Sequence, residues 1–347
     1  TQDNGPGIPR DAVEHVFGKF LLGSRFHAIR QTRGQQGIGI TGVVMYSQLT
    51  TGVKTKVTSK IASDSSAVFV DIGLDTRKNR AIKSREKRDV WFDDITGEVV
   101  EHGLRIEARM KGKYQRGKQS VFQYLRMTSI VNPHATISLV VRDRDGEVYE
   151  QGSWKRTTDK LPRVVEEIKP HPHGIQLGTL QRMLRESEER KMTSFLRHNF
   201  SGVSMRAAKE ILSLAEINEN RSPKRISTND ANGMLNGFQN VKLLPPPTDC
   251  LSPIDDLLIK KGLSKAIDSR FAATVTRNPT VSQGNPFQIE VGLVFGGDLT
   301  ADGPIEVLRF ANRVPLMYQQ GGCALTKAIE SIDWKRYGLD HPGGKGL

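Results

Sequence analysis

Two proline-rich breaks divide the chain of 347 residues and constrain its fold more than any other feature. Residues 161–172 contain three prolines and are predicted to form a linker. Pro245–Pro247 is predicted to be a stiff boundary, because consecutive prolines hold the backbone extended. We therefore expect three domains, over residues 1–161, 172–247 and 248–347. A chain of this length commonly holds two or three domains, at roughly 150 residues each.

The three parts differ in their hydrophobic patterns. Helical patterns in the first part cover 12–20, 39–49 and 120–131, and strand patterns cover 54–61, 67–74, 104–110, 135–141 and 147–149. The strands cluster instead of alternating with the helices, which favours an α+β sandwich over a doubly wound parallel sheet. Residues 175–240 are helical throughout, with Ser227–Asp230 as a cluster of N-cap residues. The third part has strand patterns at 287–295 and 305–313 and a helical pattern at 322–332, so we expect an α/β unit.

Composition excludes several classes of protein. Charged residues make up 26% and hydrophobic residues 37%, which excludes disorder of the whole chain. No apolar run approaches the ~20 residues of a membrane span, so we expect no membrane association. The only cysteines, Cys250 and Cys323, cannot form a disulfide framework and are expected to be buried small hydrophobes. A net charge of +13 permits a polyanionic partner but does not by itself establish one.

Basic residues gather in two runs. We interpret the first as a loop between strands, with a solvated loop and a loop facing double-stranded DNA as the two alternatives. Its members are Arg77, Lys78, Arg80, Lys83, Arg85, Lys87 and Arg88. The same alternatives hold for the second run, within residues 111–118. Aromatic residues do not interleave with these charges, which argues against base stacking on single strands. His171 and His173 could suggest a metal pair, but with no third ligand nearby a proline-fixed junction is the better interpretation.

Two glycine clusters carry the strongest chemical signal. Asp3–Pro9 can present a carboxylate at a tight turn, suited to accepting the exocyclic amine of a base. Gly34–Ile40 has three glycines directly before a predicted helix, where backbone N–H groups can converge on a phosphate. Neither cluster is the dinucleotide fingerprint, and no P-loop occurs. Either alone could be an ordinary turn, but the pair with a helix between them indicates a nucleotide site.

These residues resemble a known superfamily of ATPases. Asp3–Pro9 resembles the first glycine box of the ATPases shared by gyrase, Hsp90, histidine kinases and MutL, and Gly34–Thr41 resembles their lid box. Further stretches narrow the resemblance to the B subunits of archaeal type IIB DNA topoisomerase VI, namely residues 169–174, 246–254, 309–315 and 333–338. The resemblance implies a Bergerat-type ATPase sandwich, then a helix-two-turns-helix domain, then the first part of a transducer domain.

The resemblance also implies roles for single residues. Asp3 would bind adenine, Gly7 would let the backbone pass close to the base, and Ser24 and Arg25 would contact the nucleotide. The lid around the triphosphate would consist of Gly34, Gln35, Gln36, Gly37, Ile38, Gly39, Ile40 and Thr41. The implied cofactors are ATP and Mg²⁺. Two positions depart from the pattern: Leu104 stands where a threonine is expected, and Asp255 where a glycine is expected.

The family's catalytic residues are expected outside this chain. The magnesium-binding asparagine and the water-activating glutamate would lie before Asp3, and the lysine that reaches the γ-phosphate after Leu347. We therefore expect a fragment truncated at both ends, with no catalytic residue and no metal ligand of its own, that does not hydrolyse ATP by itself.

The implied function is that of an ATP-operated clamp. Two copies would dimerise on ATP, hold double-stranded DNA and act with an A subunit in an A2B2 heterotetramer that relaxes supercoiled DNA in the cytoplasm, at the nucleoid. Two alternatives stay open. One is another ATPase of the same superfamily, which the helical stretch 175–240 argues against. The other is a non-catalytic DNA-binding module with a vestigial nucleotide site.

Overall fold

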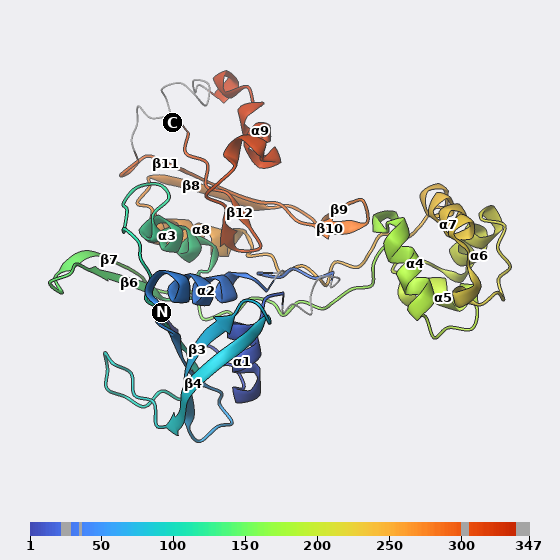
Figure 1. Ribbon diagram of the computed structural model, residues 1–347. Coiled ribbons are helices and arrows are strands. Elements are labelled where there is room, and N and C mark those ends of the chain that lie inside the picture. Colours follow the sequence, from blue (N-terminus) through green and yellow to red (C-terminus); the bar gives the residue numbers. More distant parts are fainter. Residues whose placement is uncertain (22–28, 35–36, 300–304, 338–347) are drawn as a thin grey trace. The chain divides into compact units, whose positions relative to one another are not determined.

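The computed structural model describes residues 1–21, 29–34, 37–299 and 305–337 (Figure 1). Contacts divide the chain into two units, residues 1–27 with 34–115 and residues 28–33 with 116–347. The short segment 28–33 therefore belongs to the second unit, although it lies between two stretches of the first. Helices and strands occur together, so the predicted α+β class is confirmed.

The first unit contains a five-stranded antiparallel sheet in the order β1-β5-β2-β3-β4. The strands are β1 (Gln2–Asp3), β2 (Thr55–Lys60), β3 (Ala67–Asp75), β4 (Arg80–Asp89) and β5 (Gly103–Glu107). Helices α1 (Arg10–Gly18) and α2 (Gly39–Thr51) bury Val13, Phe17 and Val44 against alternate residues of β2 and β3. Period-2 burial along β3 matches its strand pattern, since successive side chains point to opposite faces.

Strand β4 corrects the prediction of a loop in the first basic run. Arg80–Asp89 pairs with β3 along its whole length and lies at the sheet edge among the described strands. A bulge interrupts the pairing, because Arg85 and Glu86 together oppose Val70. The bulge interrupts the alternation of side chains along β4, so the strand has no regular period of 2 in its sequence. Charged residues are also common on edge strands, where they take the place of an apolar pattern. The sequence pattern of β4 was therefore that of a loop.

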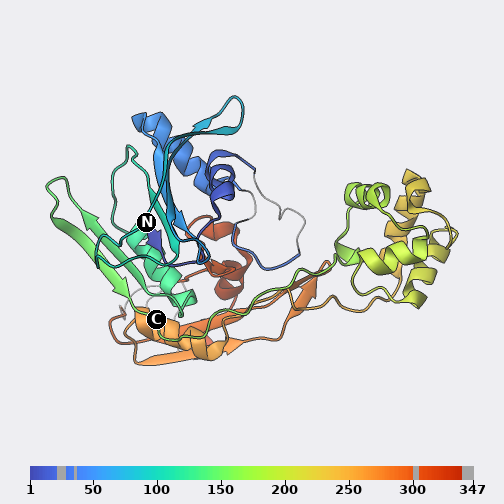
Figure 2. The same cartoon turned by 90° about the horizontal axis from the view of Figure 1, so that it is seen from below.

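The second unit begins with helix α3 (Val121–Val131), whose N-cap Ser120 accepts a hydrogen bond from the Gln123 amide at 3.2 Å. Strands β6 (Ile137–Arg142) and β7 (Val148–Trp154) form the predicted hairpin, which contacts α3 (Figure 2). Trp154 packs edge-on against Phe122, with ring centroids 5.2 Å apart. Both predictions, the helix and the hairpin, are confirmed.

The helical stretch has a hydrophobic core of its own. The helices of this stretch are α4 (Leu177–Glu186), α5 (Met192–Asn199), α6 (Met205–Leu214) and α7 (Thr228–Asn240), with short 3-10 turns at Pro172–Gly174 and Pro223–Arg225. Ser227 and Asp230 form a capping box at the start of α7, which confirms the predicted N-cap cluster. His171 is buried, and its Nε2 lies 3.0 Å from the carbonyl oxygen of Leu244. That contact supports a structural junction at this histidine.

The last part of the chain contains an eleven-residue helix, a shorter helix and several two-stranded sheets. Helix α8 (Asp256–Ala266), for which no pattern was recognised, packs against β8 (Phe271–Thr276) and β11 (Glu290–Phe295). The remaining elements are β9 (Thr280–Ser282), β10 (Asn285–Phe287), β12 (Phe310–Ala311), β13 (Val314–Pro315), α9 (Ala324–Glu330) and 3-10 turns at Gln320–Gly322 and Trp334–Tyr337. The strand predicted at 287–295 is split into β10 and β11. That predicted at 305–313 is reduced to Phe310–Ala311 within the part that the structure describes.

Candidate functional site

The first glycine cluster forms a turn that requires glycine at Gly7. Gly7 has a φ of +72°, and a Cβ there would collide with the backbone carbonyl of Lys60. The next residue is fixed from the same strand: Ser59 Oγ accepts a hydrogen bond from the Ile8 amide at 2.8 Å and donates one to the Ile8 carbonyl at 2.9 Å. Ser59 is only 1% exposed. Strand β2 therefore holds the turn through main-chain and side-chain contacts that the glycine pattern does not reveal.

Asp3 lies on β1 and is paired with Leu104 of β5. Its Oδ1 accepts a hydrogen bond from the Gly5 amide at 2.9 Å, and its side chain is exposed. Within the described residues, Oδ2 has no hydrogen-bond partner, so it is available to a ligand. Leu104 packs against the core of the unit and offers no hydroxyl group. Gly103 (φ +149°) lets β5 approach β1 closely, since a Cβ would collide with the Asp3 carbonyl.

The second glycine cluster leads into the N-terminus of α2. Gly34 and Gly37 have φ values of +75° and +61°, and the Gly37 carbonyl accepts a hydrogen bond from the Leu21 amide at 3.2 Å. At the first turn of α2, the described residues provide no side-chain cap and no acidic residue. Its N-cap is Ile38, and a Cβ on Gly39 would meet open space. Unpaired amides and the helix dipole make such an end favourable for an anion.

Thr41 has a structural partner that the sequence did not indicate. It is fully buried, and its Oγ1 lies 3.3 Å from the Lys19 carbonyl and 3.5 Å from the Val16 carbonyl. Both carbonyls belong to the C-terminal end of α1 or directly follow it. The two glycine clusters therefore adjoin opposite ends of α1, whose nine residues span about 13 Å at the usual helical rise.

Four predicted nucleotide-contacting residues lie outside the described residues. They are Ser24, Arg25, Gln35 and Gln36. Of the remaining candidates, Gly34, Gly37, Ile38 and Gly39 are exposed, and Ile40 is half-buried. All of the described candidates belong to the first unit.

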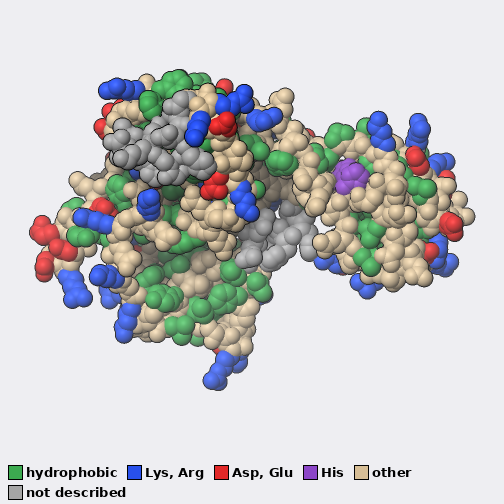
Figure 3. Space-filling view, turned by 90° about the horizontal axis from the view of Figure 1, so that it is seen from above, with side chains coloured by type: hydrophobic (Ala, Val, Ile, Leu, Met, Phe, Trp, Pro, Cys, Tyr) green, Lys and Arg blue, Asp and Glu red, His purple; other side chains and the backbone are tan. Residues whose placement is uncertain are grey.

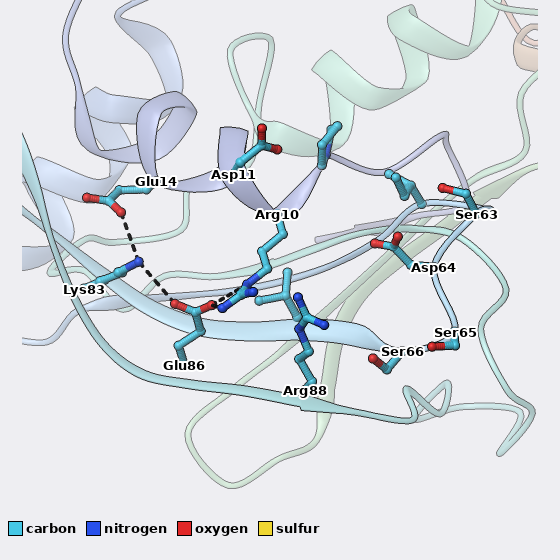
Figure 4. A pocket seen from close by; sticks show the side chains of 13 residues that line it. Arg10, Asp11, Glu14, Ser63, Asp64, Ser65, Ser66, Lys83, Glu86 and Arg88 are labelled. Atoms are coloured by element: carbon cyan, nitrogen blue, oxygen red, sulfur yellow. Dashed lines mark hydrogen bonds and ion pairs between the residues drawn. The ribbon is translucent and has the colours of Figure 1, made fainter.

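One cavity of about 630 Å³ lies beyond the N-terminus of α1 (Figure 4). It is lined by α1, by β4 and by the turn 61–66, and not by Asp3, Gly7 or the second cluster. Two of its cations are already neutralised: Arg10 pairs with Glu86, and Lys83 lies 3.2 Å from carboxylate oxygens of both Glu14 and Glu86. Asp11 and Asp64 add further negative charge. The cavity is therefore a poor site for a triphosphate.

The ion pairs of this cavity also shift the acidity of their members. Hydrogen bonds from Arg10 and Lys83 lower the pKa of Glu86, and hydrogen bonds to Glu14 and Glu86 raise the pKa of Lys83. Successive turns of α1 contact this side of β4 through three pairs of residues. Gly18 lies against Ala81, Glu14 pairs with Lys83, and Arg10 pairs with Glu86. This side of β4 therefore holds α1 in place.

The first basic run is divided by strand geometry. Lys83 and Arg88 face α1 and the cavity, whereas Lys87 lies on the opposite face, over the Phe69 ring at 4.9 Å. Arg80 pairs with Asp75 and Lys87 with Asp89. In the described structure no ion pair involves the side chains of Arg77, Lys78, Arg85 and Arg88. On the face drawn in Figure 3, lysines and arginines are scattered among acidic and apolar side chains.

The described residues offer neither a metal site nor a membrane-spanning helix. No group of three or more His, Cys, Asp or Glu residues is placed to hold a metal ion. No helix is both long and apolar enough to cross a membrane.

Comparison with known proteins identifies the class and then the family. Residues 246–346 match the family described as "Topoisomerase VI B subunit, transducer", so the last part of the chain is a transducer domain. The B subunit of type 2 DNA topoisomerase 6 from Methanococcoides burtonii is 46% identical over 99% of this chain and 54% of the relative. The protein of the same name from Methanosarcina acetivorans gives the same values, and that of Thermococcus gammatolerans is 35% identical over 98% of this chain and 66% of the relative.

The chain belongs to the family of type 2 DNA topoisomerase 6 B subunits. It spans about half the length of the first of these relatives.

Proposed function

We propose that the first unit binds ATP, with adenine at the Asp3–Pro9 turn and the triphosphate at the N-terminus of α2. The observation that carries this proposal is the pairing of a glycine-only turn with an uncapped helix end at opposite ends of α1. A nucleotide needs two such places, one for a flat base and one for a chain of anions. A rigid helix between them fixes their separation.

At the adenine end, Asp3 contributes one free carboxylate oxygen. Because Oδ1 is occupied by the Gly5 amide, Oδ2 is the oxygen that accepts a hydrogen bond from the exocyclic amine of adenine. Gly7 lets the turn lie directly against the Lys60 carbonyl, where a Cβ would not fit, and the base would pack beside the main chain of this turn. Guanine carries an acceptor in place of that amine, and the site should therefore favour ATP over GTP.

At the phosphate end, main-chain amides do most of the binding. Gly34, Gln35, Gln36, Gly37, Ile38, Gly39 and Ile40 form the proposed loop around the triphosphate, with Ser24 and Arg25 as further contacts. Thr41 would not contact the nucleotide; its hydroxyl group holds the first turn of α2 against the end of α1. Mg²⁺ bound together with ATP would neutralise part of the negative charge of the phosphates. We assign no side chain of the described residues as its ligand.

We propose further that the whole protein is the ATP-binding subunit of a type IIB DNA topoisomerase. Residues 1–161 would be its Bergerat-type ATPase domain, 172–247 its helix-two-turns-helix domain and 248–347 part of its transducer. ATP-driven dimerisation would close a clamp on double-stranded DNA, and an A subunit would make the double-strand break, in an A2B2 complex at the nucleoid in the cytoplasm. The names of the relatives and the transducer match support this assignment.

The DNA-contacting surface is proposed on part of the first basic run. Three of the seven cations have acidic partners, namely Arg80, Lys83 and Lys87. The cations without ion-pair partners in the described structure, Arg77, Lys78, Arg85 and Arg88, are therefore the best candidates. Replacing Arg77 and Lys78 by alanine should weaken plasmid binding and reduce the slope of its salt dependence by about 2. An unchanged slope would remove this surface from the proposal.

The nucleotide site is tested by two substitutions of Asp3. Titration of a fluorescent ATP analogue into Asp3→Ala and Asp3→Asn should show loss of binding, because both remove the negative charge that faces the amine. Asp11→Ala is the matched control, since Asp11 is an exposed aspartate in the first turn of α1, shortly after the glycine turn. If Asp3→Ala binds ATP as well as the wild type does, or if the wild type does not bind ATP, the proposed function is wrong and the alternative of a vestigial site gains support.

A further inference from the structure

The segment Ile29–Arg33 lies against the residues that begin the transducer match, within the second unit. The Ile29 carbonyl accepts a hydrogen bond from the Ile168 amide at 3.1 Å, and the Gln31 amide donates one to the Cys250 carbonyl at 2.8 Å. Asn312, in the turn between β12 and β13, donates from Nδ2 to the Thr32 carbonyl at 3.0 Å. We call Ile29–Arg33 the strap, since its contacts reach three separate parts of the chain.

The side chain of Gln31 makes the most specific of these contacts. Its Oε1 accepts a hydrogen bond from the Ser252 amide at 2.7 Å, and its Nε2 donates one to the Ser252 carbonyl at 3.3 Å. A side-chain amide thus satisfies both main-chain groups of one residue, as a neighbouring strand would. Gln31 and Ser252 are 221 positions apart in the chain. Such a pair has no local role, so its effect is to join two distant segments.

Ser252 lies at a buried junction that leads directly into α8. It is 6% exposed, and its carbonyl also accepts a hydrogen bond from Arg313, which is 7% exposed. Two residues further on, Glu290 holds the amides of Ile254 and Asp255 at 3.0 and 2.9 Å. If the Gln31 side chain moves away, the Ser252 amide loses its hydrogen-bond acceptor. An unpaired buried amide raises the free energy of the folded chain. The conformation of this junction therefore depends on the strap.

The strap also continues, without a break in the chain, into the second glycine cluster. Gly34 directly follows Arg33, and α2 begins at Gly39. Any change in the conformation of the cluster must therefore either keep the strap in place or pull on it. Close to the cluster the strap is fixed at two consecutive residues, Gln31 by its main chain and side chain and Thr32 by its carbonyl.

We propose that Gln31 is a positioning residue that couples nucleotide binding at the glycine cluster to the start of the transducer. This inference rests on the proposed function. A docked strap holds one end of the cluster and so reduces the conformational entropy that is lost when phosphate is bound. By linkage, the nucleotide then stabilises the docked strap to the same degree. The two events favour each other.

The test combines hydrogen exchange with nucleotide affinity, on the full 347-residue chain. Gln31→Met keeps the length of the side chain and removes both hydrogen bonds to Ser252. Gln181→Met is the matched control, because Gln181 makes a side-chain hydrogen bond to Thr228 at an exposed position of the helical stretch. Exchange is followed in peptides covering 249–255, with and without a non-hydrolysable ATP analogue and Mg²⁺.

In the wild type, the analogue should slow exchange in 249–255. Gln31→Met should raise exchange there about tenfold without nucleotide, abolish the response to the analogue and weaken analogue binding by about tenfold. Gln181→Met should behave as the wild type. A wild-type response that persists in Gln31→Met, or a wild type that binds the analogue without any response in 249–255, would overturn the coupling.

Failure of the proposed function gives a different result. If the wild type does not bind the analogue at all, the coupling falls together with the nucleotide site. The strap contact is then judged alone, from the rise in exchange in Gln31→Met without nucleotide.

Discussion

Ser59→Ala should destabilise the glycine turn and weaken ATP binding together. The substitution removes both hydrogen bonds between Ser59 Oγ and Ile8, at 2.8 and 2.9 Å, and leaves an amide and a carbonyl without partners beside a side chain that is 1% exposed. At roughly 1 kcal/mol for each bond, the free energy of opening β2 should fall by about 2 kcal/mol. Native-state hydrogen exchange of residues 55–60 measures that free energy directly.

Ser47→Ala is the control for Ser59→Ala. Ser47 is equally buried in the same unit, but its Oγ donates only one hydrogen bond, to the Val53 carbonyl at 3.3 Å. It should cost about 1 kcal/mol or less and leave ATP affinity unchanged, whereas Ser59→Ala should weaken ATP binding by about tenfold. Equal losses of stability in the two variants, or unchanged ATP affinity in Ser59→Ala, would refute the inference that β2 positions the glycine turn for the nucleotide.

Three further predictions concern strain, thiol reactivity and pH. Asp255 has a φ of +78° and caps α8, so Asp255→Gly should keep or raise stability in urea denaturation, while Asp255→Ala should lose about 1 kcal/mol because the cap is gone and the strain remains. A hydrogen bond from Arg309 lowers the pKa of Cys323 to about 7, so iodoacetamide should modify this thiol with a midpoint near that pH, and buried Cys250, whose pKa is raised by burial, should stay unmodified in the folded chain. Because its ion pairs lower the pKa of Glu86, Glu86→Gln should destabilise the chain at neutral pH, and the difference from the wild type should vanish as the pH falls below the ordinary carboxyl pKa and through the lowered one.

Features encoded within a few residues were predictable. The helix at Val121–Val131 has a serine cap and an apolar face, and the hairpin β6–β7 has an Asp-Gly turn between two strand patterns. The glycine turn at Gly7 was recognised for the same reason, since glycine at a tight turn is a local signal. The reason that only glycine fits there is not local: the obstacle is the Lys60 carbonyl, on another strand.

Features that depend on distant partners were missed. The charged strand β4 has no apolar alternation to indicate it, and it is defined by pairing with β3 and by its ion pairs to α1. The prediction that Cys323 is buried is wrong, since this residue is half-exposed. Its hydrogen bond with Arg309 joins two separate segments, so it has no local sequence signal. Asp255 was noted as standing where glycine is expected, and the structure supplies the reason, a positive φ.

Helix α1 is what makes the two glycine clusters one candidate site. Its N-terminus follows the turn that Ser59 holds, and the carbonyls at its C-terminal end receive Thr41 from α2. Its sheet-facing side is fixed independently. Val13 and Phe17 pack in the core, and Arg10 and Glu14 form ion pairs with residues of β4. The separation of the clusters is therefore set by a packed helix of fixed length. A substitution that loosens α1 from β4, such as Glu86→Gln, should for this reason change both ends of the proposed site at once, even though Glu86 contacts neither.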